Sequence, residues 1–357
     1  MSEVRSTSVN VVKHQHYFNG LQALRGWAAI AVVFYHCHVL FQKEKYFGVQ
    51  LFNGFLESGH RGVELFFVIS GFLMAMLMQK PREKYSPKAF LVSRVKRIYI
   101  PYLPVFILLT CMCVFATSAC PAAYRFDAKT VLMNLLVWPR EDQNTYVPVV
   151  AWSLAHEVFF YLMTFMAIAL RSLGWPLLAL WFGTSAVLAL AEITVVFPWS
   201  FIFSFYENMA FGLGMLAFML VDSGRSVAYT RQIRLTGITL LVIFAFLEGY
   251  LVDIRGGTYG RDLAGGFLVA AFLLVVGYAD APPRKMKILG DMSYSLYLVH
   301  YPVLVIGIRL LIIPFDGNLP QYFVLVCMLI AAMAAGAMYY YFVERPGLKL
   351  FNRKIES

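Results

Sequence analysis

Long apolar stretches alternate with short polar segments along the 357-residue chain. A helix needs about 20 consecutive apolar residues to cross a bilayer, and ten stretches are close to that length. They predict ten transmembrane helices, near residues 21–41, 62–79, 98–117, 151–170, 174–191, 200–220, 235–252, 263–279, 291–313 and 321–343. We therefore expect an all-α polytopic integral membrane bundle in which residues 1–357 form a single domain.

Composition supports the membrane class. Hydrophobic residues make up 60% of the chain and charged residues only 14%, whereas soluble domains are about 45–50% apolar and about 25% charged. The net charge of +10 does not predict nucleic-acid binding, because the basic residues lie between the apolar runs rather than in one patch. Their distribution is typical of topology determinants.

The distribution of Lys and Arg predicts the orientation. If the N-terminus is cytoplasmic, the inside segments hold 20 Lys and Arg residues, the outside loops hold eight, and two lie in helices. Positive residues accumulate on the cytoplasmic side of membrane proteins. Both termini are therefore expected in the cytoplasm.

The cysteines do not form a metal or redox motif. Cys37, Cys111, Cys113 and Cys327 lie inside apolar runs, Cys120 lies beside one, and no C-x-x-C occurs. We therefore expect neither a disulfide framework nor a metal site. The sequence also lacks G-x-x-x-x-G-K-[ST] and H-E-x-x-H, which argues against ATP hydrolysis and zinc peptidase chemistry.

The first apolar run, "RGWAAIAVVFYHCH", carries ionisable residues at both ends. His36 lies eleven positions after Arg25, so on a helix both lie on one face about 16 Å apart. Arg25 could extend to the inner headgroups while His36 makes an interhelical hydrogen bond. Two ionisable residues on one stripe favour a functional site instead, because intramembrane charges are costly.

The fourth predicted helix begins "AWSLAHEVFFYL" and places Glu157 about 8 Å below the outer surface. His36 is expected at a similar depth, so the carboxylate could orient the imidazole as in a general-base dyad. The spacing equally allows Glu157 to be a structural partner of His156, Trp152 or another helix.

Further ionisable residues are predicted inside the membrane or at its inner edge. Glu64, Glu207 and His300 lie within predicted helices, where each could also be paired internally. The inside segment from Lys80 to Arg97 carries seven basic residues. It is typical of an anchor on anionic headgroups, and a docking surface for a phosphorylated donor is the alternative.

Six motifs in order resemble the acyltransferase 3 family of polytopic membrane acyltransferases over nearly the whole chain. They are "LQALRGWAAIAVVFYHCH", "GVELFFVISGFLM" at 62–74, "RVKRIYIP" at 94–101, "WSLAHEVFFY" at 152–161, "SYSLYLVHYPV" at 293–303 and "FVERP" at 342–346. The first contains the family's Arg-x10-His as Arg25 and His36. Two departures are small: Glu64 is often aspartate in the family, and the basic pair is Arg94 and Arg97. Some relatives continue into an esterase-like domain, whereas this chain is expected to be the membrane module alone.

The resemblance implies a bacterial inner-membrane O-acyltransferase without a permanently bound cofactor. Its donor would be a cytosolic acyl-CoA, commonly acetyl-CoA, and its acceptor a hydroxyl of an exported glycan or its lipid-linked precursor. Membrane lipid and polysaccharide assembly proteins are the other partners implied. Under this reading Arg25, Arg94 and Arg97 bind the donor, while Trp152, Glu64 and His300 contact the acceptor.

The same resemblance implies catalytic roles for the first and fourth helices. His36 would remove the hydroxyl proton, Glu157 would orient it, and Arg25 would hold the donor or counter negative charge. Ser70, Ser153 and Cys37 are conceivable nucleophiles without an evident activating partner. A lipid-linked saccharide flippase is the alternative from another class. A membrane-bound O-acyltransferase of the other major type is disfavoured, because its histidine and asparagine pattern is not seen.

Overall fold

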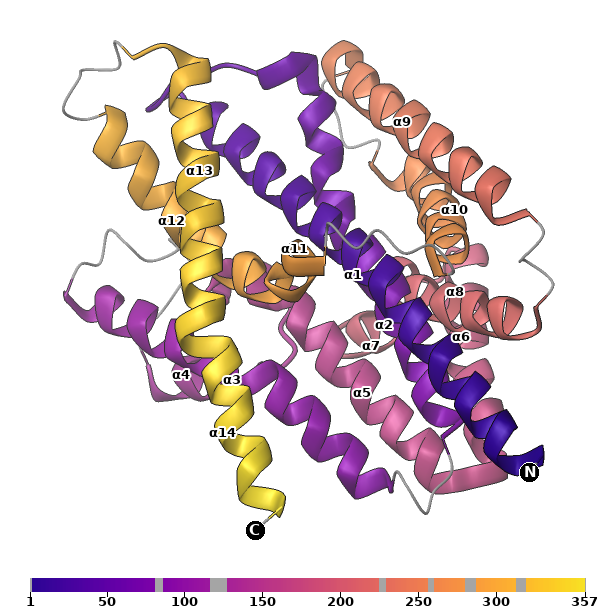
Figure 1. The fold of residues 1–357 in the computed structure, drawn as a ribbon. Coiled ribbons are helices and arrows are strands. Elements are labelled where there is room, and N and C mark those ends of the chain that lie inside the picture. Colours follow the sequence, from indigo (N-terminus) through magenta and orange to yellow (C-terminus); the bar gives the residue numbers. More distant parts are fainter. Residues whose placement is uncertain are drawn as a thin grey trace. The chain divides into compact units, whose positions relative to one another are not determined.

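The computed structural model describes residues 2–80, 86–115, 127–224, 229–255, 260–279, 287–312 and 319–356, and these ranges contain helices and no strand (Figure 1). The chain divides into two compact units. The first comprises Met1–Met76 and Ala210–Ser293, and the second Leu77–Met209 and Tyr294–Ser357. Each unit is therefore built from two segments that are far apart in the sequence.

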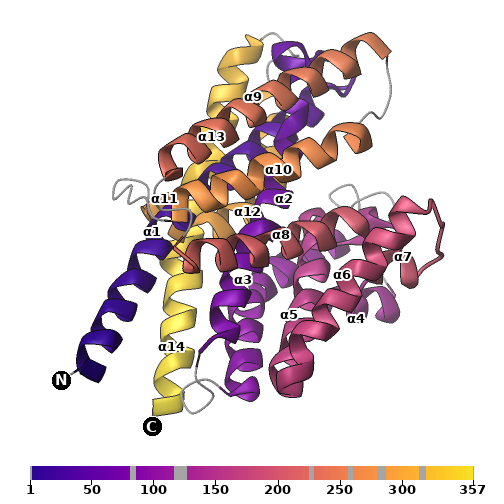
Figure 2. The same cartoon turned by 90° about the vertical axis from the view of Figure 1, so that its right-hand side faces the viewer.

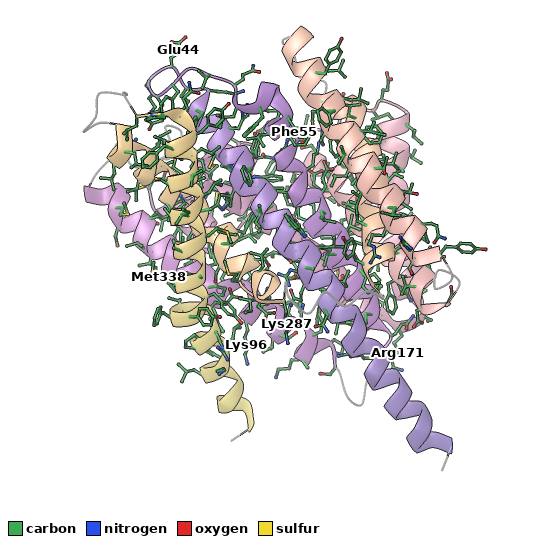
Figure 3. All side chains as sticks on the ribbon, turned by 45° about the horizontal axis from the view of Figure 1, so that its top comes forward. Glu44, Phe55, Lys96, Arg171, Lys287 and Met338 are labelled. Carbon is green, nitrogen blue, oxygen red and sulfur yellow. The ribbon has the colours of Figure 1, made fainter. Side chains whose placement is uncertain are left out.

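The first unit is assembled around the N-terminal helix. Its elements are α1 (Ser2–Phe41), the 3-10 helix η1 (Leu51–Arg61), most of α2 (Gly62–Met78) and of α8 (Phe205–Asp222), α9 (Thr230–Arg255), α10 (Gly260–Ala279) and α11 (Lys287–Asp291). Helices α9 and α10 run side by side in both views (Figures 1 and 2). Phe55 of η1 packs on Phe246 of α9 with ring centroids 5.0 Å apart, so η1 joins the packing of this unit (Figure 3).

The second unit contains the remaining helices. They are α3 (Pro87–Phe115), α4 (Ala128–Leu135), α5 (Trp152–Leu170), α6 (Gly174–Leu190), α7 (Trp199–Ile202), α12 (Ser293–Ile312), α13 (Gln321–Tyr339) and α14 (Arg345–Glu356), with short 3-10 turns between some of them. A π-helical turn, Tyr340–Glu344, joins α13 to α14, and the three form one long rod (Figure 1). Lys96 of α3 donates from Nζ to the carbonyl oxygen of Phe351 at 3.2 Å, which ties this rod to α3 (Figure 3).

Eight helical segments among the described residues are long and apolar enough to cross a membrane. One of them, Val149–Leu190, contains two arms, because Phe159 and Phe160 pack beside Trp181 across the break between α5 and α6. With both arms counted, and with the shorter apolar helix Leu263–Ala279, all ten predicted helices are present. The predicted class, an all-α polytopic membrane protein, is confirmed.

Helix boundaries differ from the sequence expectation at two places. Helix α3 begins at Pro87 rather than near 98, so Arg94 and Arg97 lie on a helix and not in a loop. The segment before α2, expected to be a loop, forms η1. Both differences have one cause: charged residues interrupt the apolar pattern, although the backbone there is helical.

The expectation of no disulfide is wrong for Cys113, which is disulfide-bonded. Its partner lies outside the described residues. The lack of C-x-x-C argues against metal and redox motifs, but it does not exclude a structural disulfide between more distant cysteines. Cys113 lies near the end of α3 that the distribution of Lys and Arg predicts to face the outer, oxidising side, where disulfides persist.

Two glycines bring α2 and α8 into close contact. A Cβ on Gly71 would lie 2.0 Å from the carbonyl oxygen of Phe211, and one on Gly214 would lie 1.9 Å from that of Val68. Helices in a membrane gain little from the hydrophobic effect between them, so close backbone approach at small residues stabilises their packing. This crossing fixes the helix that begins with Gly62 against the one that ends at Asp222.

The segment before α5 is held by polar contacts to α3. Asn134 is buried; its amide donates to two carbonyl oxygens and its Oδ1 accepts from the backbone N–H of Val147 at 2.9 Å. The hydroxyl of Tyr102 on α3 donates to the Asn134 carbonyl oxygen at 2.7 Å. At the start of α4, Asp127 caps the helix, and the hydrogen bonds from Thr130 keep the pKa of its carboxyl below the usual value. Residues 127–150 of the predicted outside loop thus contain a capped helix and a network of polar contacts.

Replacing Gly214 by Val should destabilise the first unit, because the added side chain would clash with the backbone of α2. Overpacking of this kind costs about 1–3 kcal/mol. We expect a lower melting temperature in detergent, measured by fluorescence-detected size exclusion after heating. Gly183→Val is the control, since a Cβ there meets nothing within 4 Å. Equal melting temperatures for the two variants would contradict the close crossing.

An even number of spans places both ends of the chain on one side of the membrane. A reporter fused after Lys354 should therefore fluoresce as a cytoplasmic green fluorescent protein and be inactive as a periplasmic phosphatase. The same pair of reporters inserted after Glu141 should give the opposite result, because that residue lies in a predicted outside loop. Phosphatase activity after Lys354 would mean that the span count is wrong by an odd number.

Candidate functional site

Arg25 and His36 both lie on α1 and both are half-buried. The helix is continuous between them, so its rise separates them by about 16 Å, as expected from the sequence. His36 donates from Nδ1–H to the carbonyl oxygen of Val32, one turn earlier, at 2.9 Å. This bond fixes the ring and its tautomer, because a carbonyl can only accept. In the neutral ring the lone pair is therefore on Nε2, the nitrogen that a general base would use.

A second histidine lies close to His36. Tyr35 meets the ring of His36 edge-on with centroids 5.0 Å apart, and it also contacts the ring of His60 on η1 at 5.4 Å. The two histidines are near enough to interact electrostatically. Gly59 permits this approach, since a Cβ there would lie 2.4 Å from the carbonyl oxygen of Ala31 on α1.

Next to His60, Arg61 is buried among acidic side chains from two helices. Its guanidinium contacts Glu64 of α2 at 2.5 Å and Glu248 of α9 at 3.0 Å. The same guanidinium lies 5.1 Å from the ring centre of Phe267 on α10. Glu248 is also 4.0 Å from Nε2 of His60. One cation thus joins η1, α2, α9 and α10 inside an apolar unit.

A further histidine of α1, His38, connects this helix to η1. The Nδ1 of His38 accepts the backbone N–H of Leu51 at 3.3 Å, so the proton is on Nε2, which lies 3.2 Å from Oε2 of Glu57. His38 is fully buried. His38 therefore holds both the first residue and the middle of η1 against the end of α1.

In the second unit, Arg97 forms an ion pair with Glu344. Its NH1 donates to Oε1 at 2.8 Å, and Ser295 of α12 donates its hydroxyl to Oε2 at 2.6 Å. Glu344 is fully buried and lies in the π-helical turn. Arg97 also lies 5.3 Å from the ring centre of Tyr294. Residues from three of the quoted motifs, "RVKRIYIP", "SYSLYLVHYPV" and "FVERP", therefore meet at this pair.

Glu157 lies near the same cluster. Its Oε1 accepts the hydroxyl of Tyr161, one turn later on α5. Arg94 lies 5.7 Å from the ring centre of Tyr161, and Glu157 is close enough to Arg97 to interact with it electrostatically. The motif "WSLAHEVFFY" thus joins the other three.

One helical turn before Glu157, a polar residue of α5 meets one of α12. The hydroxyl oxygens of Ser153 and Tyr297 are 2.7 Å apart. Each of them is also 3.1 Å from the carbonyl oxygen of Val150, within hydrogen-bond distance. His300 is buried and donates from Nδ1–H to the Leu296 carbonyl oxygen at 3.1 Å. Trp152 packs edge-on against His156 with centroids 6.1 Å apart.

The predicted site residues divide between the units. Arg25, His36 and Glu64 belong to the first, and Arg94, Arg97, Trp152, Glu157 and His300 to the second. The pairing of His36 with Glu157 therefore stays a prediction. No group of three or more His, Cys, Asp or Glu side chains in the described ranges is arranged to hold a metal ion.

Sequence reasoning missed several charged residues of these clusters. Glu248 lies in a helix that was predicted at 235–252, and an acid in an apolar helix is itself a signal for a site. His60 and Arg61 were assigned to a loop. Glu344 stands in a quoted motif, but nothing in the sequence showed that it faces Arg97.

Comparison with known proteins identifies the family. The sequence profile of the acyltransferase domain family matches residues 18–340, which is most of the chain. The chain belongs to this family. The resemblance carried by the six motifs is confirmed, and the acyltransferase domain accounts for both units.

Two relatives of this acyltransferase domain are named O-acetyltransferase OatA and come from Staphylococcus aureus strains NCTC 8325 / PS 47 and COL. Each is 26% identical to this chain over 94% of its length. The chain spans 58% of the length of these relatives. No solved structure matches it.

The contacts predict different roles for the two arginines of α3. Arg97→Ala leaves Glu344 as a buried charge without its cation, which costs up to about 3 kcal/mol. Arg94→Ala removes a ring contact worth about 1 kcal/mol. We expect a clearly lower melting temperature for Arg97→Ala than for Arg94→Ala. Adding Glu344→Gln to Arg97→Ala should recover part of the loss, and no recovery would show that the ion pair does not determine this stability.

Proposed function

We propose that this acyltransferase domain transfers an acyl group, commonly acetyl, from a cytosolic acyl-CoA to a hydroxyl of an exported glycan or its lipid-linked precursor. Family membership supports acyl transfer, and the names of the relatives support O-acetyl transfer. The observation that carries the proposal is His36: its Nδ1–H is bound to a backbone carbonyl oxygen, which leaves Nε2 as the basic nitrogen.

The reaction needs one base and one anchored donor. His36 Nε2 takes the proton of the acceptor hydroxyl, the alkoxide oxygen attacks the thioester carbon, and the C–S bond breaks. The thiolate leaves with that proton as free CoA thiol, so His36 returns to its neutral state. Because a carbonyl of its own helix orients the ring, His36 does not need a carboxylate for its tautomer, and Glu157 would act by stabilising positive charge.

Donor binding requires fixed positive charge. Arg25 is on the helix of His36, about three turns away, and guanidinium groups bind phosphate and carbonyl oxygens by paired hydrogen bonds. On α3, Arg94 is better suited to phosphate than Arg97, because Arg97 already neutralises Glu344. We assign Arg25 and Arg94 to the donor. Trp152, Glu64 and His300 remain proposed contacts of the acceptor.

The proposed reaction also implies the membrane in which the protein acts. A cytosolic donor and an exported acceptor meet only in a membrane that bounds the cytoplasm, which is the inner membrane of a bacterium. The apolar helices make the chain an integral membrane protein. Membrane lipid surrounds it, and polysaccharide assembly proteins are proposed partners for delivery of the glycan.

The two ends of the first motif should separate binding from chemistry. Arg25→Ala should weaken acetyl-CoA binding at least tenfold, and Arg25→Lys should recover part of it, because the charge remains and the guanidinium fork is lost. His36→Ala should bind acetyl-CoA normally and transfer no label. Calorimetry on detergent-purified protein measures binding, and labelled acetyl-CoA with membranes of the source organism measures transfer.

Arg309→Ala is the control, since Arg309 lies near the end of α12 and is not assigned to donor or acceptor. Equal acetyl-CoA affinity in all variants would remove Arg25 from the donor site. Transfer by His36→Ala within a few-fold of the parent would reject His36 as the base. A parent protein that never transfers label would favour a saccharide flippase.

A further inference from the structure

Helix α4 lies in the segment that the sequence predicts to be an outside loop, yet its exposed side is apolar. Leu132, Leu135 and Leu136 lie on one side of the helix, at positions i, i+3 and i+4, and Trp138 follows them. These four side chains, here called the α4 face, are between 38% and 54% exposed. An exposed apolar surface of this kind marks a site of contact with protein or membrane.

The helix cannot turn this face inward. Its opposite side carries Asn134, which is fully buried and whose Oδ1 accepts the backbone N–H of Val147 at 2.9 Å. Val131, one turn earlier on the same side, packs against the buried core of the second unit. An amphipathic helix of a soluble protein buries its apolar side and exposes its polar one. Helix α4 does the reverse, and its polar contacts hold the α4 face outward.

The backbone at the end of α4 is suited to apolar surroundings. The carbonyl oxygen of Leu136 accepts the hydroxyl of Tyr99 at 2.8 Å, and that of Trp138 accepts the hydroxyl of Tyr146 at 2.9 Å. The N–H groups of Leu136 and Trp138 donate to carbonyl oxygens of α4 at 3.0 and 2.8 Å. Backbone that leaves a helix at membrane depth is tolerated only where the protein satisfies its polar groups. The chain meets that requirement at these two residues.

The neighbour of α4 identifies the surroundings. Helix α4 packs beside α3, whose segment Pro87–Cys113 is long and apolar enough to cross a membrane (Figure 1). Tyr99, which bonds to Leu136, lies between Val95 and Ile107 on α3, and these two apolar side chains are 46% and 57% exposed. Helix α4 therefore joins α3 within the stretch that faces lipid.

Polar residues border the α4 face at both ends. Asp127 and Lys129 are exposed before it, and Glu141–Asn144 are exposed after it. An apolar face between charged ends is typical of a helix that lies in the membrane interface, where tryptophan is also enriched. A stable contact with a second chain takes about 20–30 residues a side, many more than this face offers. Lipid is the occupant that fits its size and its borders.

We propose that the α4 face is seated in the acyl-chain region of the bilayer, with Asp127 and Glu141–Asn144 in water on either side. Residues 127–150 are then a membrane-attached segment and not a loop in water. This contact does not depend on acyl transfer. Because Asn134 also holds Val147, the segment fixes the start of α5 relative to the membrane surface.

The test is the quenching of Trp138 fluorescence in lipid nanodiscs, which leave both membrane faces open to the buffer. The chain has six tryptophans, so the signal of Trp138 is the difference between the parent and Trp138→Phe. We expect this difference to lose at least half of its intensity when the lipid carries brominated acyl chains. Iodide in the buffer should change it little, because an anion does not enter the acyl-chain region.

Gln143→Trp in the Trp138→Phe background is the matched control. Residue 143 belongs to the same segment and is exposed beyond the α4 face, so its tryptophan should be quenched by iodide and not by brominated lipid. Leu135→Trp in the same background reports the α4 face from a second position. It should respond as Trp138 does, and it carries the test if the emission of Trp138 is too weak to resolve.

Two results would overturn the inference. Quenching of Trp138 and of Leu135→Trp by iodide alone, as in Gln143→Trp, would place the α4 face in water. Protection of both from iodide and from brominated lipid would show that protein covers the face, as in a dimer of this chain. The proposed acyl transfer would stand in either case, since His36→Ala tests it separately.

Discussion

The ion pairs of Arg61 with Glu64 and Glu248 are the interaction on which the first unit depends. A guanidinium in an apolar bundle is tolerated only if carboxylates neutralise it. Here the two carboxylates come from different helices, α2 and α9, and the ring of Phe267 comes from a third, α10. The charge therefore determines which helices must lie together. The small residues of α1 and α2 then allow the backbones to approach closely enough to meet it.

In the second unit, too, a buried charge is paired with one of opposite sign. Arg97 and Glu344 balance each other, and Ser295 satisfies the remaining carboxylate oxygen. Arg94 lies 5.7 Å from the ring centre of Tyr161, whose hydroxyl donates to Glu157, so two guanidinium groups and two carboxylates gather here among the described residues.

The sequence allowed the fold class and the family to be predicted, because apolar length and ordered motifs are local properties. It also predicted His36 as a site residue from the spacing of Arg25 and His36 on one helix face, and that role stays a prediction. It did not reveal His60, Arg61 or Glu248 as a group, since 187 residues separate Arg61 from Glu248 along the chain. Such a contact depends on packing that local periodicity does not encode. The lone acid in the helix around Glu248 was the available signal, and the cost of burying it gave the reason to use it.

The backbone bond from His36 to Val32 changes the kind of help that the proposed base requires. In a dyad, a carboxylate both fixes the tautomer and stabilises the imidazolium that forms. Here a carbonyl one turn away already fixes the tautomer, so the remaining task is to adjust how readily the ring takes a proton. That task needs only charge at moderate distance and no direct contact. The pairing with Glu157 that the sequence suggests would supply negative charge of this kind, and it stays a prediction.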